Sequence, residues 1–311
     1  MHRSVKLLGD RMDLSIESLS PAELGQVSLG EAILRATHRL AASGSMTPRL
    51  DAEVLLGYVL GLSRAQLNAR WDEPLTAEQA ERYAELVHRR AEHEPVAYLI
   101  GQKAFYDLQL YVDRRALIPR PETEHLVEEA LAWGRAWQSD EGQPLRAVDV
   151  GTGSGALAIA LARHLQAHVW AVDISAEALA VAAYNVGRYN LEGRVMLLCA
   201  DLLSAFGGRF DLIVANLPYV RQEDLPSLPQ DVIGYEPWVA LDGGEDGLAV
   251  IRRLLSQAHE HLASPGLLLL EIGHGQGDRV LEIARSHLPE ATISLLHDYA
   301  GLERVVRVER P

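Results

Sequence analysis

The chain has 311 residues, of which 48% are hydrophobic and 23% charged, and its formal net charge is −14. These values are typical of a globular protein with one large or two smaller domains. The acidic balance argues against nucleic acid as the main partner, because proteins that bind phosphates are usually basic.

Cysteine content and hydropathy narrow the possible compartment. Cys199 is the only cysteine, which excludes an internal disulfide and a multi-cysteine zinc site and suits a reducing cytoplasm. No apolar run reaches the ~18 residues of a membrane helix, and Met1–Asp10 lacks the pattern of a secretory signal. These features predict a cytoplasmic protein that contacts no membrane. We also expect a monomer that needs no metal and contacts no nucleic acid directly.

The first third of the chain predicts helices. Residues 1–27 show no clear periodicity, and we expect a mobile extension there. Residues 28–94 contain apolar positions at helical spacing and predict a small helical domain. Thr76, followed three residues later by Gln79, forms a capping-box pattern at the start of a helix predicted to end before Pro95.

Residues 95–118 change to β character, with apolar and aromatic residues that predict a hairpin linking two domains. The apolar positions are Val96, Tyr98, Ile100, Phe105, Tyr106, Leu108, Leu110 and Val112. Pro119-Arg120-Pro121 ends this pattern and starts a helix.

From Leu145 onward, strand-like runs alternate with helical stretches. The predicted strands cover residues 147–150, 169–172, 195–198, 210–215, 266–272, 292–296 and 305–308. This alternation predicts an α/β fold, a mostly parallel sheet with helices on both faces. The last two strands are only about eight residues apart, too close for a crossover helix, and should pair antiparallel.

A glycine-rich turn follows the first of these strands, in the run Asp149-Val150-Gly151-Thr152-Gly153-Ser154-Gly155. Glycines permit a sharp turn and the close approach of a ligand. Asp173, 22 residues after Gly151, ends the next strand and can accept both hydroxyls of a ribose. The turn alone fits NAD as well as S-adenosylmethionine. Asp149 favours the methyl donor, because an acid suits its ammonium group, and Asp201 could reach an adenine edge or be an exposed loop acid.

The run Asn216-Leu217-Pro218-Tyr219 follows the fourth strand, where ligands of such sheets bind. An amide or exocyclic amino nitrogen is a poor nucleophile, so its methylation calls for two acceptors aimed at its N–H groups. The Asn216 side-chain oxygen and the Leu217 carbonyl can supply them. Pro218 restricts residue 217 to extended backbone, and Tyr219 can stack on a flat target. The run therefore predicts methyl transfer to a planar nitrogen, although a plain loop would also contain such residues.

The order of these motifs resembles the HemK/PrmC family, the glutamine N5-methyltransferases that modify peptide chain release factors. The resemblance covers about Leu29 to Val308. Its most specific runs are Pro119-Arg120-Pro121-Glu122-Thr123-Glu124 and Asp242-Gly243-Gly244-Glu245-Asp246-Gly247. Further matching runs are Glu236-Pro237, Glu271-Ile272-Gly273 and Asp298 to Arg304.

The resemblance implies a Rossmann-like class I methyltransferase domain with a seven-stranded mixed sheet over residues 119–311. It also implies a helical domain over 28–94 that helps recognise the release factor, and a hairpin linker over 95–118. The donor S-adenosylmethionine would be held by Asp149, Gly151, Thr152, Gly153, Ser154, Gly155, Asp173, Asp201, Leu202 and Asn216. Asn216, Leu217, Pro218 and Tyr219 would hold the glutamine of a Gly-Gly-Gln motif.

Two departures from the family pattern matter. Leu217 stands where the family usually has proline, and Leu202 stands where it commonly has an aromatic residue. Asn-Leu-Pro-Tyr also occurs in KsgA-like rRNA adenine dimethyltransferases, a reading that predicts a basic surface and a helical domain after the sheet. A ribosomal-protein glutamine methyltransferase and a non-catalytic binder remain as further alternatives.

Overall fold

The structure, a computed structural model, describes residues 27–137 and 142–311. The predicted extension over 1–27 therefore lies outside the described residues, apart from Val27. The chain divides into two compact units, the first reaching to Ile100 and the second starting at Gly101. No helix in the described part of the chain is both long and apolar enough to cross a membrane.

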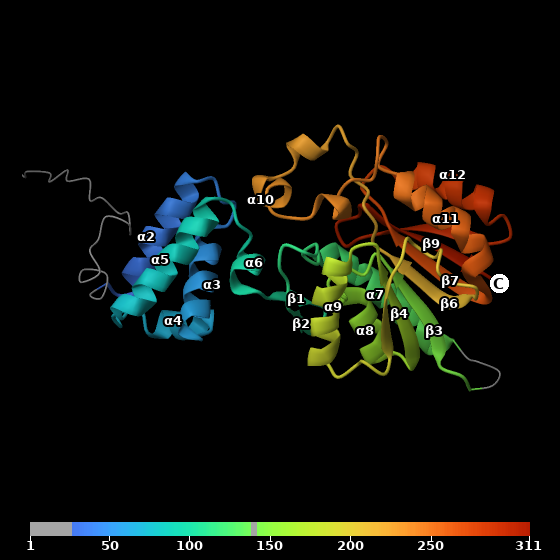
Figure 1. Cartoon of the computed structure of the whole chain (residues 1–311). Helices are drawn as coiled ribbons and strands as arrows, with labels where there is room; N and C mark the ends of the chain where they lie inside the picture. The colour runs from blue at the N-terminus through green and yellow to red at the C-terminus, as the bar shows by residue number, and fades with distance from the viewer. Residues whose placement is uncertain (1–26, 138–141) are drawn as a thin grey trace, which may run out of the picture. The chain divides into compact units, whose positions relative to one another are not determined.

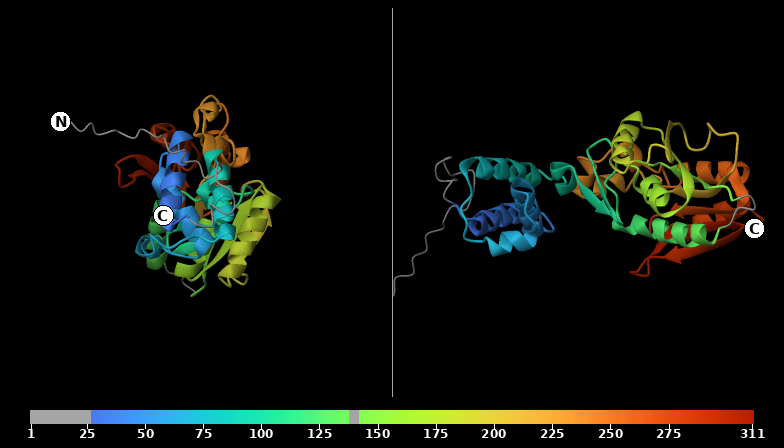
Figure 2. Two further views of the ribbon diagram at one scale, coloured as in Figure 1. Left: turned by 90° about the vertical axis from the view of Figure 1, so that its left-hand side faces the viewer. Right: turned by 90° about the horizontal axis from the view of Figure 1, so that it is seen from below.

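The first unit is helical, as the periodicity predicts (Figures 1 and 2). Its helices are α2 (Leu29–Ala42), α3 (Pro48–Leu60), α4 (Arg64–Ala69), α5 (Ala77–Ala91) and α6 (Val96–Ile100). The capping box at the start of α5 is present: Gln79 N donates to Thr76 Oγ1 at 3.3 Å and Thr76 N donates to Gln79 Oε1 at 2.9 Å. A core of fully buried aliphatic side chains, including Ile33, Leu40 and Leu55, lies between the helices.

A buried carboxylate joins three parts of this unit. Asp51, 5% exposed in α3, accepts from Arg90 Nε of α5 at 2.8 Å. The same carboxylate accepts from the hydroxyls of Ser45 and Thr47 in the preceding turn, both at 2.8 Å. A buried charge is tolerated when it is paired and fully hydrogen-bonded, and removal of one partner is strongly destabilising.

We expect Asp51→Ala to lower the free energy of unfolding of the protein by about 3 kcal/mol, because the variant removes the carboxylate partner of the buried Arg90 and the acceptor of two hydroxyls. Urea unfolding followed by circular dichroism measures the change. Asp72→Ala, which removes an exposed carboxylate in the same unit, should change it by less than about 0.5 kcal/mol. Equal effects of the two variants would contradict this assignment.

The predicted hairpin over 95–118 is wrong in its first part. Val96–Ile100 forms helix α6, and the strands are only β1 (Lys103–Phe105) and β2 (Leu108–Leu110), paired antiparallel. Phe105, Leu108 and Leu110 are buried in the core of the second unit. The hairpin is therefore part of that unit.

The second unit is built on a seven-stranded sheet in the described residues, with strand order β5-β4-β3-β6-β7-β9-β8 (Figure 1). Its strands are β3 (Leu145–Val150), β4 (Ala167–Asp173), β5 (Val195–Cys199), β6 (Phe210–Ala215), β7 (Leu262–Glu271), β8 (Thr292–His297) and β9 (Glu303–Arg310). The five strands β3 to β7 are parallel, and β9 is antiparallel to both β7 and β8. The predicted mixed sheet and its antiparallel last pair are confirmed.

Helices cover both faces of this sheet, as Figures 1 and 2 show. One face packs against α7 (Glu124–Ala136), α8 (Ala156–His164) and α9 (Ala176–Arg188), and the other against α11 (Ala249–His261) and α12 (Gly277–His287). Neighbours such as Ala147 and Val148 are both fully buried but belong to opposite faces. Because both faces are covered, the central strands are continuously apolar, as in Leu267–Leu270.

Shorter helical turns complete the unit between the main elements. They are η2 (Pro121–Thr123), η3 (Leu225–Ser227), α10 (Gln230–Ile233) and η4 (Trp238–Ala240). The last three lie in the long segment between β6 and α11. The chain starts the sheet at β3, adds β4 and β5 on one side of it and then places β6 on its other side. At such a switch point a crevice opens beyond the carboxyl ends of the strands.

Candidate active site

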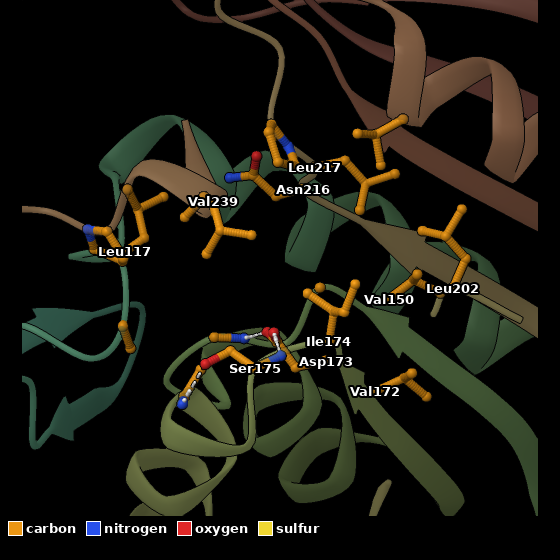
Figure 3. Close-up of a pocket in the computed structure, with 18 of the residues that line it drawn as sticks. Leu117, Val150, Val172, Asp173, Ile174, Ser175, Leu202, Asn216, Leu217 and Val239 are labelled. Atoms are coloured by element: carbon orange, nitrogen blue, oxygen red, sulfur yellow. Dashed lines mark hydrogen bonds between the residues drawn. The ribbon is translucent and has the colours of Figure 1, made fainter. Parts of the chain in front are cut away.

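A cavity of about 300 Å³ lies at this switch point (Figure 3). Figure 3 shows Asp173 and Ser175 on one side, at the end of β4, and Asn216 and Leu217 on the other, after β6. Of the predicted site residues, the lining includes Gly151, Gly153, Asp173, Asp201, Leu202, Asn216, Leu217 and Pro218. Most of the remaining wall is aliphatic, from residues such as Val150, Val172 and Ile174.

The glycine turn has the backbone that only glycine adopts without strain. Gly151, Gly153 and Gly155 have φ angles of 77°, 54° and 85°. Gly151 N and Thr152 N donate to the Val172 carbonyl at 2.8 and 2.9 Å, which ties the turn to the end of β4. A Cβ atom on Gly151 would lie 3.1 Å from Leu217 Cδ2, so the two predicted motifs are in close contact.

Asp173 is held in a fixed orientation by the backbone. Its Oδ2 accepts from Gly153 N and its Oδ1 from Ser175 N, both at 2.9 Å (Figure 3). Burial raises the pKa of Asp173, and the hydrogen bonds from Ser175 and Gly153 oppose that rise. Each oxygen keeps capacity for a second hydrogen bond, so the carboxylate can bind a pair of hydroxyls in the cavity.

Asp149 lies beneath the turn and does not line the cavity. Its Oδ2 accepts from Thr152 Oγ1 at 2.6 Å and from Ala158 N at 3.0 Å, while its buried Oδ1 has no partner in the described residues. Burial raises the pKa of this carboxyl to about 7. Asp149 therefore supports the turn and the first turn of α8 directly, and its predicted contact with a donor ammonium stays a prediction.

The segment that follows β5 contributes Asp201 and Leu202. Asp201 lines the cavity, and its carboxylate forms an ion pair with Arg253 of α11. Leu202 is buried against the cavity and has a φ angle of 53°. Its aliphatic side chain offers less contact area to a flat base than the aromatic residue common in the family.

The run Asn216-Leu217-Pro218-Tyr219, which we call the acceptor run, has two oxygens that could accept hydrogen bonds from a substrate. Asn216 Nδ2 donates to Thr123 Oγ1 at 2.9 Å, whereas Asn216 Oδ1 and the Leu217 carbonyl accept no hydrogen bond from residues 27–137 or 142–311. Both residues line the cavity beside Pro218, but Tyr219 does not. Tyr219 is instead fixed from both ends: its hydroxyl donates to Glu271 Oε1 at 3.4 Å and its carbonyl accepts from Gln276 Nε2 at 2.9 Å.

Several residues at the site have no predicted role, although Glu236 and Glu271 lie in runs that match the family pattern. Glu271 at the end of β7 accepts from Thr123, and Gln276 joins Gly273 N to the Tyr219 carbonyl. Glu236, 4% exposed, pairs with Arg120 and accepts from Ile118 N at 3.2 Å. A charged residue at the end of an apolar strand, as Glu271 is, was the available signal, because burial of such a residue requires dedicated partners.

The chain matches two family models and many known relatives. Residues 31–101 match the model described as the PrmC N-terminal domain, and residues 147–233 match a methyltransferase domain. A release factor glutamine methyltransferase of Moorella thermoacetica is 43% identical over 280 residues, which are 89% of this chain and 97% of the relative. The chain belongs to the release factor glutamine methyltransferase family.

Two other members of this family show similar agreement. The protein of Rhodopirellula baltica is 40% identical over 86% of this chain and 91% of its own length, and that of Koribacter versatilis is 39% identical over 92% and 99%. The resemblance stated from the motifs is thereby confirmed, together with the α/β methyltransferase fold and the helical N-terminal part. The rRNA adenine dimethyltransferase alternative predicts a helical domain after the sheet, but the helical unit precedes the sheet in sequence.

Proposed function

We propose that the protein transfers a methyl group from S-adenosyl-L-methionine to the side-chain nitrogen N5 of the glutamine in the Gly-Gly-Gln motif of a peptide chain release factor. S-adenosyl-L-homocysteine is the other product. The acceptor run carries this proposal: the chain is a member of this family, and Asn216 Oδ1 and the Leu217 carbonyl lie at the wall of the cavity and accept no hydrogen bond from the described residues. We further expect a monomeric cytoplasmic enzyme whose partner is the release factor itself.

The cavity has the features that the donor requires. Asp173 can accept ribose hydroxyls, and the aliphatic wall of Val172, Ile174 and Leu202 suits an adenine ring. The glycine turn brings backbone close to the ligand without Cβ atoms. When bound there, S-adenosylmethionine supplies an electrophilic methyl group on a sulfonium centre.

The acceptor oxygens act on the glutamine amide. Each can accept one of the two N–H hydrogens, which fixes the nitrogen and increases its electron density as positive charge begins to form on it. Methyl transfer forms one N–C bond and breaks one C–S bond, and one N–H proton then passes to solvent. Pro218 restricts Leu217 to extended backbone, so the carbonyl keeps its direction although Leu217 replaces the usual proline.

A labelling experiment tests the proposal. Purified protein, donor with a labelled methyl group and release factor should give labelled release factor, and a release factor with the Gly-Gly-Gln glutamine changed to alanine should remain unlabelled. Label that persists in this altered factor would overturn the proposed acceptor. Label on a ribosomal protein or on ribosomal RNA, with none on the release factor, would favour one of the alternative acceptors.

A further inference from the structure

One buried carboxylate binds Tyr219 at one end of the acceptor run directly and is linked to Asn216 at the other end through Thr123. Glu271 is 1% exposed at the end of β7, the strand paired with β6. Its Oε2 accepts from Thr123 Oγ1 at 2.7 Å, and its Oε1 accepts from the Tyr219 hydroxyl at 3.4 Å. Thr123 in turn accepts from Asn216 Nδ2 at 2.9 Å. A chain of hydrogen bonds thus runs from Glu271 through Thr123 to Asn216.

The direction of these hydrogen bonds decides which atom of the Asn216 amide is available to a substrate. The Thr123 hydroxyl has a single hydrogen. While Glu271 is ionised it can only accept, so it takes that hydrogen, and the Thr123 oxygen accepts from the Asn216 NH₂ group. The oxygen of the Asn216 amide is then free to accept. If the Thr123 hydrogen turned toward Asn216, the amide would rotate and present its NH₂ group, which cannot accept a glutamine N–H.

We propose that Glu271 is a positioning residue for methyl transfer, which sets the orientation of the Asn216 amide through Thr123 and anchors Tyr219 with its second oxygen. The inference rests on the proposed function. Glu271 lies outside the cavity lining and need not touch the substrate. Its effect should therefore appear in turnover and not in binding of the donor.

The charges around Glu271 give the pH dependence its sign. Burial raises the pKa of Glu271 to about 7; the hydrogen bonds from Thr123 and Tyr219 and the charge of Arg304 oppose the rise, and Glu122 adds to it. Below this pKa the carboxyl is protonated and can donate to Thr123, so the chain of hydrogen bonds can reverse. The rate of turnover should consequently increase with pH through about 7 and level off above it.

Four variants test the inference in the full-length protein, with release factor as substrate and S-adenosylhomocysteine as the binding probe. Glu271→Gln and Thr123→Val should lower kcat roughly 10- to 100-fold, as loss of hydrogen bonds to a charged group does. The probe should bind within about threefold of wild type, because the cavity wall is intact. Thr123→Ser, which retains the hydroxyl, should restore kcat to within about threefold, and the exposed Glu282→Gln serves as the matched control.

The pH profile and a spectroscopic signal separate positioning from a merely structural role. Glu271→Gln should lose the rise of kcat near pH 7, while Glu282→Gln keeps it. Unchanged kcat and pH profile in Glu271→Gln, or equal defects in Thr123→Val and Thr123→Ser, would overturn the inference while wild-type methylation upholds the proposed function. If the wild-type protein methylates no release factor, the proposed function fails, and the orienting role of Thr123 is then tested by the side-chain ¹⁵N–¹H NMR signal of Asn216. This signal should shift in Thr123→Val and return to its wild-type position in Thr123→Ser. An unshifted signal in Thr123→Val would refute the orienting role.

Discussion

Asn216→Ala should lower the rate of methyl transfer by on the order of 10³-fold, the loss seen when one preorganised hydrogen-bonding group is removed from a transition state. The variant removes the oxygen that accepts the glutamine N–H and leaves the Leu217 carbonyl as the remaining acceptor. Binding of S-adenosylhomocysteine should persist within a few-fold, because Asp173 and the glycine turn are untouched. Single-turnover transfer of a labelled methyl group and calorimetric binding of the product measure the two effects separately.

The matched control for Asn216→Ala is Gln143→Ala, which removes an exposed side-chain amide in the same unit, away from the cavity. It should retain wild-type transfer, since surface changes of this kind alter stability by less than about 0.5 kcal/mol. Full activity of Asn216→Ala would refute the acceptor role. Loss of product binding as large as the loss of turnover would instead assign Asn216 to the donor site.

Most elements of the fold could be predicted because their signals are local. The apolar runs of the sheet, the capping box at Thr76 and the glycine turn each depend on a few consecutive residues. The prediction of a strand at Val96–Ile100, which is a helix in the structure, was wrong for a physical reason. Its alternating large apolar residues predict a strand, but Pro95 provides the first carbonyl of a helical turn and accepts from Tyr98 N at 3.0 Å and Leu99 N at 3.1 Å. Packing of Leu99 in the helical core then overrides the β propensity.

The candidate site divides in the same way. Asp173 ends an apolar strand and Asn216 follows one, so their place at the edge of the sheet follows from sequence alone. Glu271 also ends such a strand, yet its link to Asn216 requires that β7 pair with β6, with Leu270 opposite Ala215. Thr123 lies 93 residues from Asn216 in sequence, and no local pattern indicates their hydrogen bond. These contacts arise from tertiary structure, which a single sequence does not contain.

Asp173→Asn should weaken binding of S-adenosylhomocysteine roughly 10- to 100-fold, the range expected for loss of charge-assisted hydrogen bonds to two hydroxyls. The amide keeps one acceptor for Gly153 N or Ser175 N, so the turn should remain folded. Burial raises the pKa of Asp173, so this carboxylate is protonated at a higher pH than an ordinary aspartate. As the pH is lowered, the affinity of the wild-type protein for S-adenosylhomocysteine should therefore begin to fall at that higher pH. Isothermal titration calorimetry across pH, with unfolding temperature as a check on folding, measures both.

The control for Asp173→Asn is Asp201→Asn, because both carboxylates line the same cavity. Asp201 differs in being 45% exposed at its side chain and in pairing with Arg253, so solvent and a cation already compete for its oxygens. We expect Asp201→Asn to weaken binding less than about fivefold. The ratio of the two effects therefore measures how far donor recognition depends on a carboxylate that the backbone holds in place. Equal losses of affinity would show that Arg253 releases Asp201 when the donor binds. The contact of Asp201 with adenine would then contribute as much to donor affinity as the contact of Asp173 with the ribose.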